Sequence, residues 1–113
     1  MTLSAGHLDL HQHFGSLLGV PTAGMKSSLS PEEDCACRLA FMDRFGIGMA
    51  ALMPGHSYSA PNGVRDVCAI NDALYAYGRL APSRFVALFG TVDPRHGRAS
   101  VNEVERLDQK SVV

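Results

Sequence analysis

Polar and apolar residues alternate in the segment HLDLHQHF, near the start of the chain. Successive side chains of a strand point to opposite faces of a sheet, so this alternation predicts a strand. Leu8 and Leu10 are expected on one face of that strand. Asp9, His11 and His13 are expected together on the opposite face, because they also recur at every second position.

Two later segments are apolar without alternation. They are IGMAALMP at positions 47–54 and RFVALFGTV at positions 84–92. Their length and their near-continuous apolar character favour strands that are buried on both faces of a sheet. The sequence therefore predicts three strands.

Helix signals lie between and after these strands. The stretch SPEE at positions 30–33 is typical of a helix start, with Ser30 as the N-cap, a proline at the first helical position and Glu33 closing a capping box. This helix is expected to end near Gly46. Its apolar stripe is expected to consist of Cys35, Leu39 and Met42.

A second helix is predicted from Val64 to Leu80, where apolar residues recur at helical spacing at Val67, Ile70, Leu74 and Tyr77. A third is predicted in SVNEVERLDQK, because Ser100 and Glu103 have the spacing of another capping box. Strands that alternate with helices favour a parallel sheet with right-handed crossovers. The expected fold class is α/β, with about three parallel strand-helix units.

Composition and charge exclude several classes of function. The chain has 113 residues, of which 46% are hydrophobic, and this fits one domain with a core. The formal net charge of -1 and the mixed charges do not suggest a nucleic-acid partner. No apolar run reaches ~18 residues and no signal peptide is visible, so no membrane partner is expected. The odd set of Cys35, Cys37 and Cys68 is expected to be free packing thiols in the reducing cytoplasm.

His11 and His13 are candidate ligands of one divalent cation, because two imidazoles on one face of a strand point the same way. Imidazole suits zinc, iron, nickel and copper better than magnesium or calcium. Asp9 has the same parity and is a candidate for a weak ligand or for a group that supports the ligands. The alternative is a pair of hydrogen-bonded structural histidines, with Asp9 holding a nearby loop.

Polar residues also follow the later strands, at the rim where parallel α/β folds bind ligands. His56, with Tyr58, follows the second strand, and Asp93, Arg95 and His96 follow the third. Each also has a simpler interpretation. His56 suits a solvated loop and Asp93 a turn or helix start. Arg95 and His96 suit either an anionic substrate group or an exposed loop.

Four stretches in order carry a resemblance to a known family: DLHQHFG, RLAFMDRFGIGMAALMPG, NDALYAYGRLAPSRF and RFVALFGTVDPRHGRASVNEVERL. From His7 to Leu107 the chain resembles the amino-terminal part of the metal-dependent amidohydrolase superfamily, in the amidohydrolase-related branch that includes aminocarboxymuconate-semialdehyde decarboxylase. The resemblance implies a (β/α) barrel with one divalent metal, usually zinc. It also implies hydrolysis, nonoxidative decarboxylation or hydration of a small molecule. His11 and His13 match the first two metal ligands of the family.

The later ligands of the family have no counterpart in this sequence. A full barrel has eight strands and about 250 residues, so positions 1–113 are expected to be the truncated amino-terminal part of a barrel domain. The intact enzyme is expected to bind a small carbonyl or carboxylate compound and to form a homo-oligomer. An open arc with two unpaired strand edges is expected to be marginally stable, to bind metal weakly and to catalyse nothing by itself.

Other functions fit the same motif. D-x-H-x-H also opens PHP-type phosphoesterases and TatD-type nucleases, although the PHP pattern usually continues into a Ser-Asp-Gly stretch that this chain lacks. A noncatalytic binding module or an inactive remnant is the third possibility. The chain has no G-x-S-x-G elbow and no glycine-rich phosphate loop, which disfavours acyl-enzyme chemistry and nucleotide binding.

Overall fold

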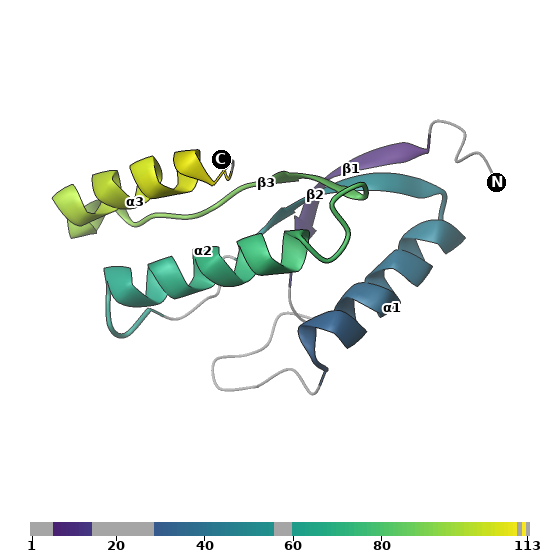
Figure 1. Cartoon of the computed structure of the whole chain (residues 1–113), viewed down its shortest axis with the longest axis horizontal. Helices are drawn as coiled ribbons and strands as arrows, with labels where there is room; N and C mark the ends of the chain where they lie inside the picture. The colour runs from purple at the N-terminus through teal and green to yellow at the C-terminus, as the bar shows by residue number, and fades with distance from the viewer. Residues whose placement is uncertain (1–5, 15–28, 56–59, 111, 113) are drawn as a thin grey trace.

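The computed structural model describes residues 6–14, 29–55, 60–110 and 112 (Figure 1). Within them, strands and helices alternate in the predicted order. The elements are β1 (His7–His13), α1 (Pro31–Arg44), β2 (Ile47–Met53), α2 (Val64–Gly78), β3 (Phe85–Leu88), the short 3-10 helix η1 (Pro94–His96) and α3 (Arg98–Gln109).

The three strands form one parallel sheet in the order β1-β2-β3. β2 pairs with both of the other strands, so β1 and β3 are the edges of this sheet among the described residues. The predicted α/β class with parallel strand-helix units is confirmed. The described strands form an open sheet, and the barrel stays a prediction from the family resemblance.

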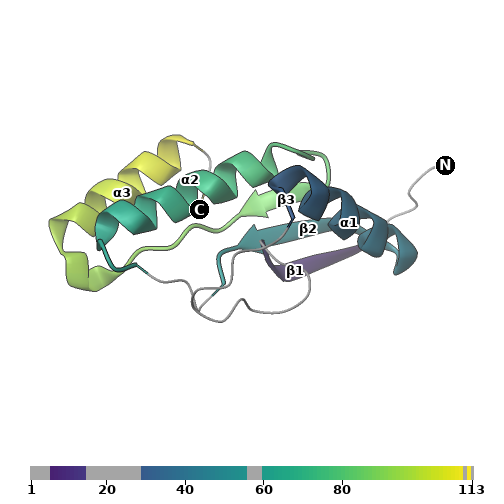
Figure 2. The ribbon, with the colours of Figure 1, turned by 90° about the horizontal axis from the view of Figure 1, so that it is seen from below.

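Helices α1 and α2 pack on the same side of the sheet (Figures 1 and 2). Their apolar stripes meet the central strand there and form the core. As predicted, Val67, Leu74 and Tyr77 of α2 are buried, and so are Cys35 and Met42 of α1. The core also contains Ala50, Leu52, Phe85, Leu107 and Val112.

The other face of the sheet remains partly exposed. Leu8 and Leu10 of β1 are 46% and 64% exposed, Met49 of β2 is 39% exposed and Val86 of β3 is 49% exposed. Leu8 pairs with Met49 in the register of the two strands. The prediction that the second and third strands are buried on both faces is therefore wrong at Met49 and Val86. The physical reason is that α1 and α2 both lie on one side.

The first helix begins as its sequence predicts. The hydroxyl of Ser30 accepts from the backbone N–H of Glu33 at 3.1 Å, and the Glu33 carboxylate accepts from the backbone N–H of Ser30 at 3.0 Å. Both halves of the capping box are therefore present. The chain leaves the helix through Gly46, whose φ of 69° lies in the left-handed region that glycine tolerates best.

The third helix begins differently from its prediction. Gly97, with φ 60°, is the N-cap of α3, and Ser100 lies inside the first turn. The hydroxyl of Ser100 donates to the carbonyl oxygen of Asp93. Glu103 is buried and contacts α2, so it does not reach back to a cap. The predicted capping box is wrong. In the folded chain, Ser100 and Glu103 form hydrogen bonds with other groups instead of capping the helix.

Replacement of Leu74 by alanine tests the core. Leu74 is fully buried, so we expect Leu74→Ala to lower the free energy of unfolding by about 2–5 kcal/mol. Leu80, which is 40% exposed, provides the matched control, and Leu80→Ala should cost less than about 1 kcal/mol. Urea unfolding followed by circular dichroism measures both. Equal losses for the two variants would contradict this assignment of the core.

Candidate metal centre

The rings of His11 and His13 lie against each other at the end of β1. Their Nε2 atoms are 3.1 Å apart. The ring centroids are 4.8 Å apart, with an interplanar angle of 81°. His11 is exposed and His13 is half-buried. The prediction that the two rings meet at the carboxyl end of the first strand is confirmed.

A backbone carbonyl fixes the tautomer of His13. Its Nδ1 lies 3.0 Å from the carbonyl oxygen of Pro54, directly after β2. A carbonyl oxygen only accepts, so Nδ1 must carry the proton and the neutral ring has a lone pair at Nε2. That lone pair faces His11, whose Nε2–H is then the donor of the contact. The proton of a neutral imidazole can move to Nδ1, which would make Nε2 of His11 a ligand as well.

The carboxylate of Asp9 is directed at the strand rather than at the two rings. Its Oδ1 accepts from the backbone N–H of His11 at 3.0 Å, and its Oδ2 accepts from Nε2 of Gln12 at 3.0 Å. The pairing of β1 with β2 shifts register between Asp9 and Gln12, and such a bulge breaks strict alternation. The expectation that Asp9 shares a face with both rings is therefore not met. Asp9 instead holds the backbone at His11.

The separation of the two nitrogens fits a shared metal ion. Zinc binds imidazole nitrogen at about 2.0–2.1 Å, so two nitrogens of one tetrahedral site lie about 3.3 Å apart. The observed 3.1 Å is close to this value. Within the described ranges, no group of three or more His, Cys, Asp or Glu side chains could hold one ion. The described residues thus bring two candidate nitrogens together, whereas a catalytic zinc typically has three protein ligands.

A buried charge network, which sequence analysis missed, lies behind the histidine pair. Arg38 of α1 is 4% exposed. Its guanidinium donates to the backbone carbonyl of His13 at 2.8 Å and to Oε1 of Gln12 at 3.0 Å. Its Nε donates to the hydroxyl of Tyr77 at 2.9 Å, and that hydroxyl donates to Asp34. Arg38 therefore ties the end of β1 to both α1 and α2.

The same network sets the protonation state of Tyr77. Burial and the hydrogen bond to Asp34 raise the pKa of Tyr77, so the phenol stays protonated and donates. Asp34 lies one turn before Arg38, with 3.6 Å between carboxylate and guanidinium. One sequence signal could have revealed this network. Asp34 and Arg38 have opposite charges and lie one turn apart, on the helix face that also carries the buried Cys35 and Met42.

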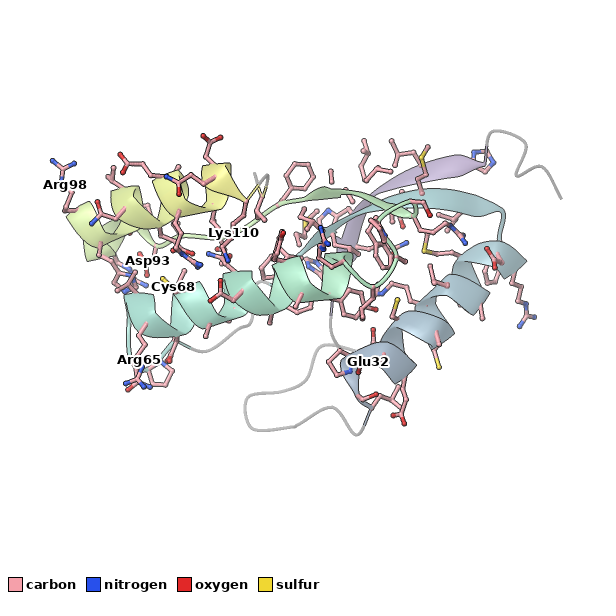
Figure 3. All side chains as sticks on the ribbon, viewed as in Figure 1. Glu32, Arg65, Cys68, Asp93, Arg98 and Lys110 are labelled. Atoms are coloured by element: carbon pink, nitrogen blue, oxygen red, sulfur yellow. The ribbon has the colours of Figure 1, made fainter. Side chains whose placement is uncertain are left out.

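The predicted rim residues after β3 form a separate group beside α2. Asp93 caps η1 by accepting from the backbone N–H of Arg95 at 3.0 Å, and the Arg95 side chain donates to both carboxylate oxygens. These bonds lower the pKa of Asp93 to about 2. His96 lies beside Gly63 at the start of α2. Figure 3 labels Asp93, in the segment that leads from β3 to α3, and Cys68, on α2.

The turn and helix-start interpretation of Asp93 is thus confirmed by its capping bonds. Roles for Arg95 and His96 toward an anionic substrate stay predictions. His56, with Tyr58, lies outside the described residues. Among the thiols, Cys35 is buried and Cys68 is half-buried, as expected of packing residues, whereas Cys37 is exposed, so the packing prediction is wrong for Cys37.

Glu103 of α3 is the centre of a second buried network. It is 2% exposed. Its carboxylate accepts from Nδ2 of Asn71 at 3.0 Å and from the thiol of Cys68 at 3.0 Å. The guanidinium of Arg106 donates to both oxygens at 2.7 Å. Asn71 also pairs twice with the backbone of Thr91, at 2.8 Å each. This network fastens α3 and the segment after β3 to α2.

Comparisons with protein-family models, with curated proteins and with solved structures found no match to this chain. The amidohydrolase resemblance therefore rests on the motifs alone. No helix in the described part of the chain is long and apolar enough to cross a membrane.

The Glu103 network predicts a fall in stability at acid pH. The bonds from Arg106 lower the pKa of Glu103 from 4.5 to about 2. A carboxyl whose pKa is lower in the folded state stabilises that state above its unfolded pKa, and this contribution is lost as the pH falls toward the folded pKa. We therefore expect up to roughly 2–3 kcal/mol of stability to disappear between pH 4.5 and pH 2.

Urea unfolding at a series of pH values measures this fall. Glu103→Gln removes the titrating group, so its free energy of unfolding should vary less with pH over the same interval. Glu105, exposed on the same helix, provides the matched control, and Glu105→Gln should retain the wild-type pH dependence. A Glu103→Gln variant with the full acid dependence would contradict the assignment.

Proposed function

We propose that this chain is a metal-binding unit of the amidohydrolase type, in which His11 and His13 hold one divalent ion, zinc by preference. The reaction class we propose for the complete site is hydrolysis or nonoxidative decarboxylation of a small carbonyl or carboxylate compound. The observation that carries the proposal is the 3.1 Å separation of the two Nε2 atoms on one strand end.

The groups around the pair support ligation over a chance contact of two histidines. Metal-binding imidazoles usually donate their second ring N–H to a carbonyl or carboxylate, which orients the ring and fixes its tautomer. The contact between Nδ1 of His13 and the carbonyl of Pro54 has this form. Asp9 holds the backbone N–H of His11, and Arg38 holds the backbone carbonyl of His13. The backbone at both positions and the ring of His13 are therefore held by groups that are not ligands.

The reaction class is supported by the resemblance and by the chemistry of the donors. A divalent ion at such a site acts as a Lewis acid toward a carbonyl or carboxylate oxygen and activates water near neutral pH. The part of this chain is to hold the ion through two neutral nitrogens. A third protein ligand and a general base must come from outside the described residues. Arg95 and His96 are candidates for binding an anionic group of the substrate, as their place after β3 suggests.

A zinc titration tests this proposal. We expect the wild-type chain to bind zinc weakly, and His11→Ala or His13→Ala to reduce the affinity at least tenfold, since each removes one of two ligands. His7 is exposed on the same strand and provides the matched control, so His7→Ala should bind zinc like the wild type. Competition with a zinc-sensitive dye measures the affinity. Circular dichroism confirms that each variant is folded.

Two results would contradict the proposal. One is an affinity for zinc that His11→Ala and His13→Ala leave unchanged. The other is a loss of affinity in His7→Ala that equals the loss in the two ligand variants. A screen of ester, amide and carboxylate substrates with zinc present tests the reaction class separately, because binding and turnover need different sets of ligands.

A further inference from the structure

Gln12, which lies between the two candidate ligands in the sequence, connects Asp9 to Arg38 beside the metal centre. Its Nε2 donates to Oδ2 of Asp9 at 3.0 Å. Its Oε1 accepts from Nη1 of Arg38 at 3.0 Å. A carboxylate only accepts and a guanidinium only donates, so these two partners fix which end of the amide faces which group. Gln12 is therefore held in one orientation by a carboxylate of β1 and a guanidinium of α1.

The hydrogen bond between Asp9 and Gln12 spans the bulge that contains His11. Between the pairs Asp9–Ala50 and Gln12–Leu52, β1 advances by three residues and β2 by two. In a regular strand, side chains three positions apart point to opposite faces, so these two side chains could not meet. The extra residue of the bulge brings them to the same side, where their hydrogen bond stabilises the bulge.

The convergence of the two histidine rings depends on this bulge. Residues two positions apart in a regular parallel strand are about 6.6 Å apart along it. The Nε2 atoms of His11 and His13 are only 3.1 Å apart. A bulge bends its strand and redirects the side chains within it, and His11 is one of these residues. Asp9 also accepts from the backbone N–H of His11 at 3.0 Å, so the bulge and the ligand are held by one carboxylate.

Hydrogen bonds from one buried residue reach the backbone of both ligands. Arg38, which is 4% exposed, donates directly to the backbone carbonyl of His13 at 2.8 Å. It reaches His11 through the amide of Gln12 and the carboxylate of Asp9. Loss of the Gln12 amide therefore uncouples His11 from Arg38, whereas the direct bond to His13 can remain.

We propose that Gln12 is a positioning residue of the metal centre, whose amide fixes the bulge that brings His11 to His13. This inference rests on the proposed function, because it concerns the same two ligands. Gln12 acts through Asp9 and Arg38, since each end of its amide bonds a protein group. Removal of groups that orient metal ligands typically costs about 10–100-fold in metal affinity.

The variant Gln12→Glu tests the proposal, because two effects on zinc affinity have opposite signs. A carboxylate at position 12 still accepts from Arg38 but cannot donate to Asp9, so the bulge loses its hydrogen bond. The added negative charge, by Coulomb attraction alone, strengthens the binding of a cation. We expect the affinity to fall about tenfold in competition with a zinc-sensitive dye. Gln109, exposed at the end of α3, provides the matched control, and Gln109→Glu should bind zinc like the wild type.

The double variant Asp9→Asn with Gln12→Glu reverses donor and acceptor and restores the hydrogen bond. The new amide at position 9 donates to the new carboxylate at position 12, and its oxygen still accepts from the backbone N–H of His11. The net charge equals that of the wild type. We expect Asp9→Asn alone to lose about tenfold in zinc affinity, because two amide donors then face each other, and the double variant to regain most of this loss.

Urea unfolding of the metal-free variants shows that each is folded, so a change in zinc affinity reports on the metal centre. An unchanged or higher affinity in Gln12→Glu would overturn the proposal. So would a double variant that binds as weakly as Gln12→Glu, or an equal loss in Gln109→Glu. If Gln12→Glu does not fold, Gln12→Leu removes both hydrogen bonds without a new charge and is expected to lose affinity to the same extent.

The wild-type chain and its ligand variants separate this inference from the proposed function. If His11→Ala and His13→Ala reduce the zinc affinity but the Gln12 variants do not, the positioning role is overturned and the proposed function stands. Zinc binding that is independent of both histidines would overturn both.

Discussion

The buried guanidinium of Arg38 is the interaction on which the arrangement of the other elements depends. A buried cation is tolerated only when its donors are satisfied, because the loss of hydration costs several kcal/mol. Arg38 meets this demand with groups from three elements: the end of β1, Asp34 on its own helix and Tyr77 on α2. The apolar contacts of the core stabilise the fold, but they do not fix the orientation of its elements. The hydrogen bonds of Arg38 have fixed directions, and they hold the end of β1 beside α1 and α2.

The geometry of the candidate metal centre depends in part on the hydrogen bonds of Arg38. Arg38 fixes the carbonyl of His13, Pro54 fixes its ring, and Asp9 fixes the backbone at His11. None of these three groups is a ligand in the proposal, yet each one removes freedom that an ion would otherwise have to restrict on binding. Such support explains how an exposed strand end can hold two rings at one separation. It does not complete the site, because the described residues contribute only two ligands.

The partly exposed face of the sheet follows from the same one-sided arrangement. The apolar runs at 47–54 and 84–92 show that side chains on both faces of their strands favour burial, but a run of this kind cannot specify what covers each face. The helices that follow the first and second strands cover one side. Met49 and Val86 lie exposed on the other side, where their apolar runs predict burial.

Sequence by itself determined the local features of this protein. The alternation of polar and apolar residues predicted the first strand, and the SPEE capping box predicted the start of α1. The spacing of His11 and His13 predicted that their rings meet. All of these features depend on neighbours along the chain. Tertiary structure decided the rest. The bulge turned Asp9 away from the rings, and Glu103 was drawn into α2, which left Gly97 to begin the third helix. Arg38 became the link between three elements only after folding. The physical reason is that a polar side chain bonds the best partner within reach, and folding brings partners that lie dozens of positions away in the sequence.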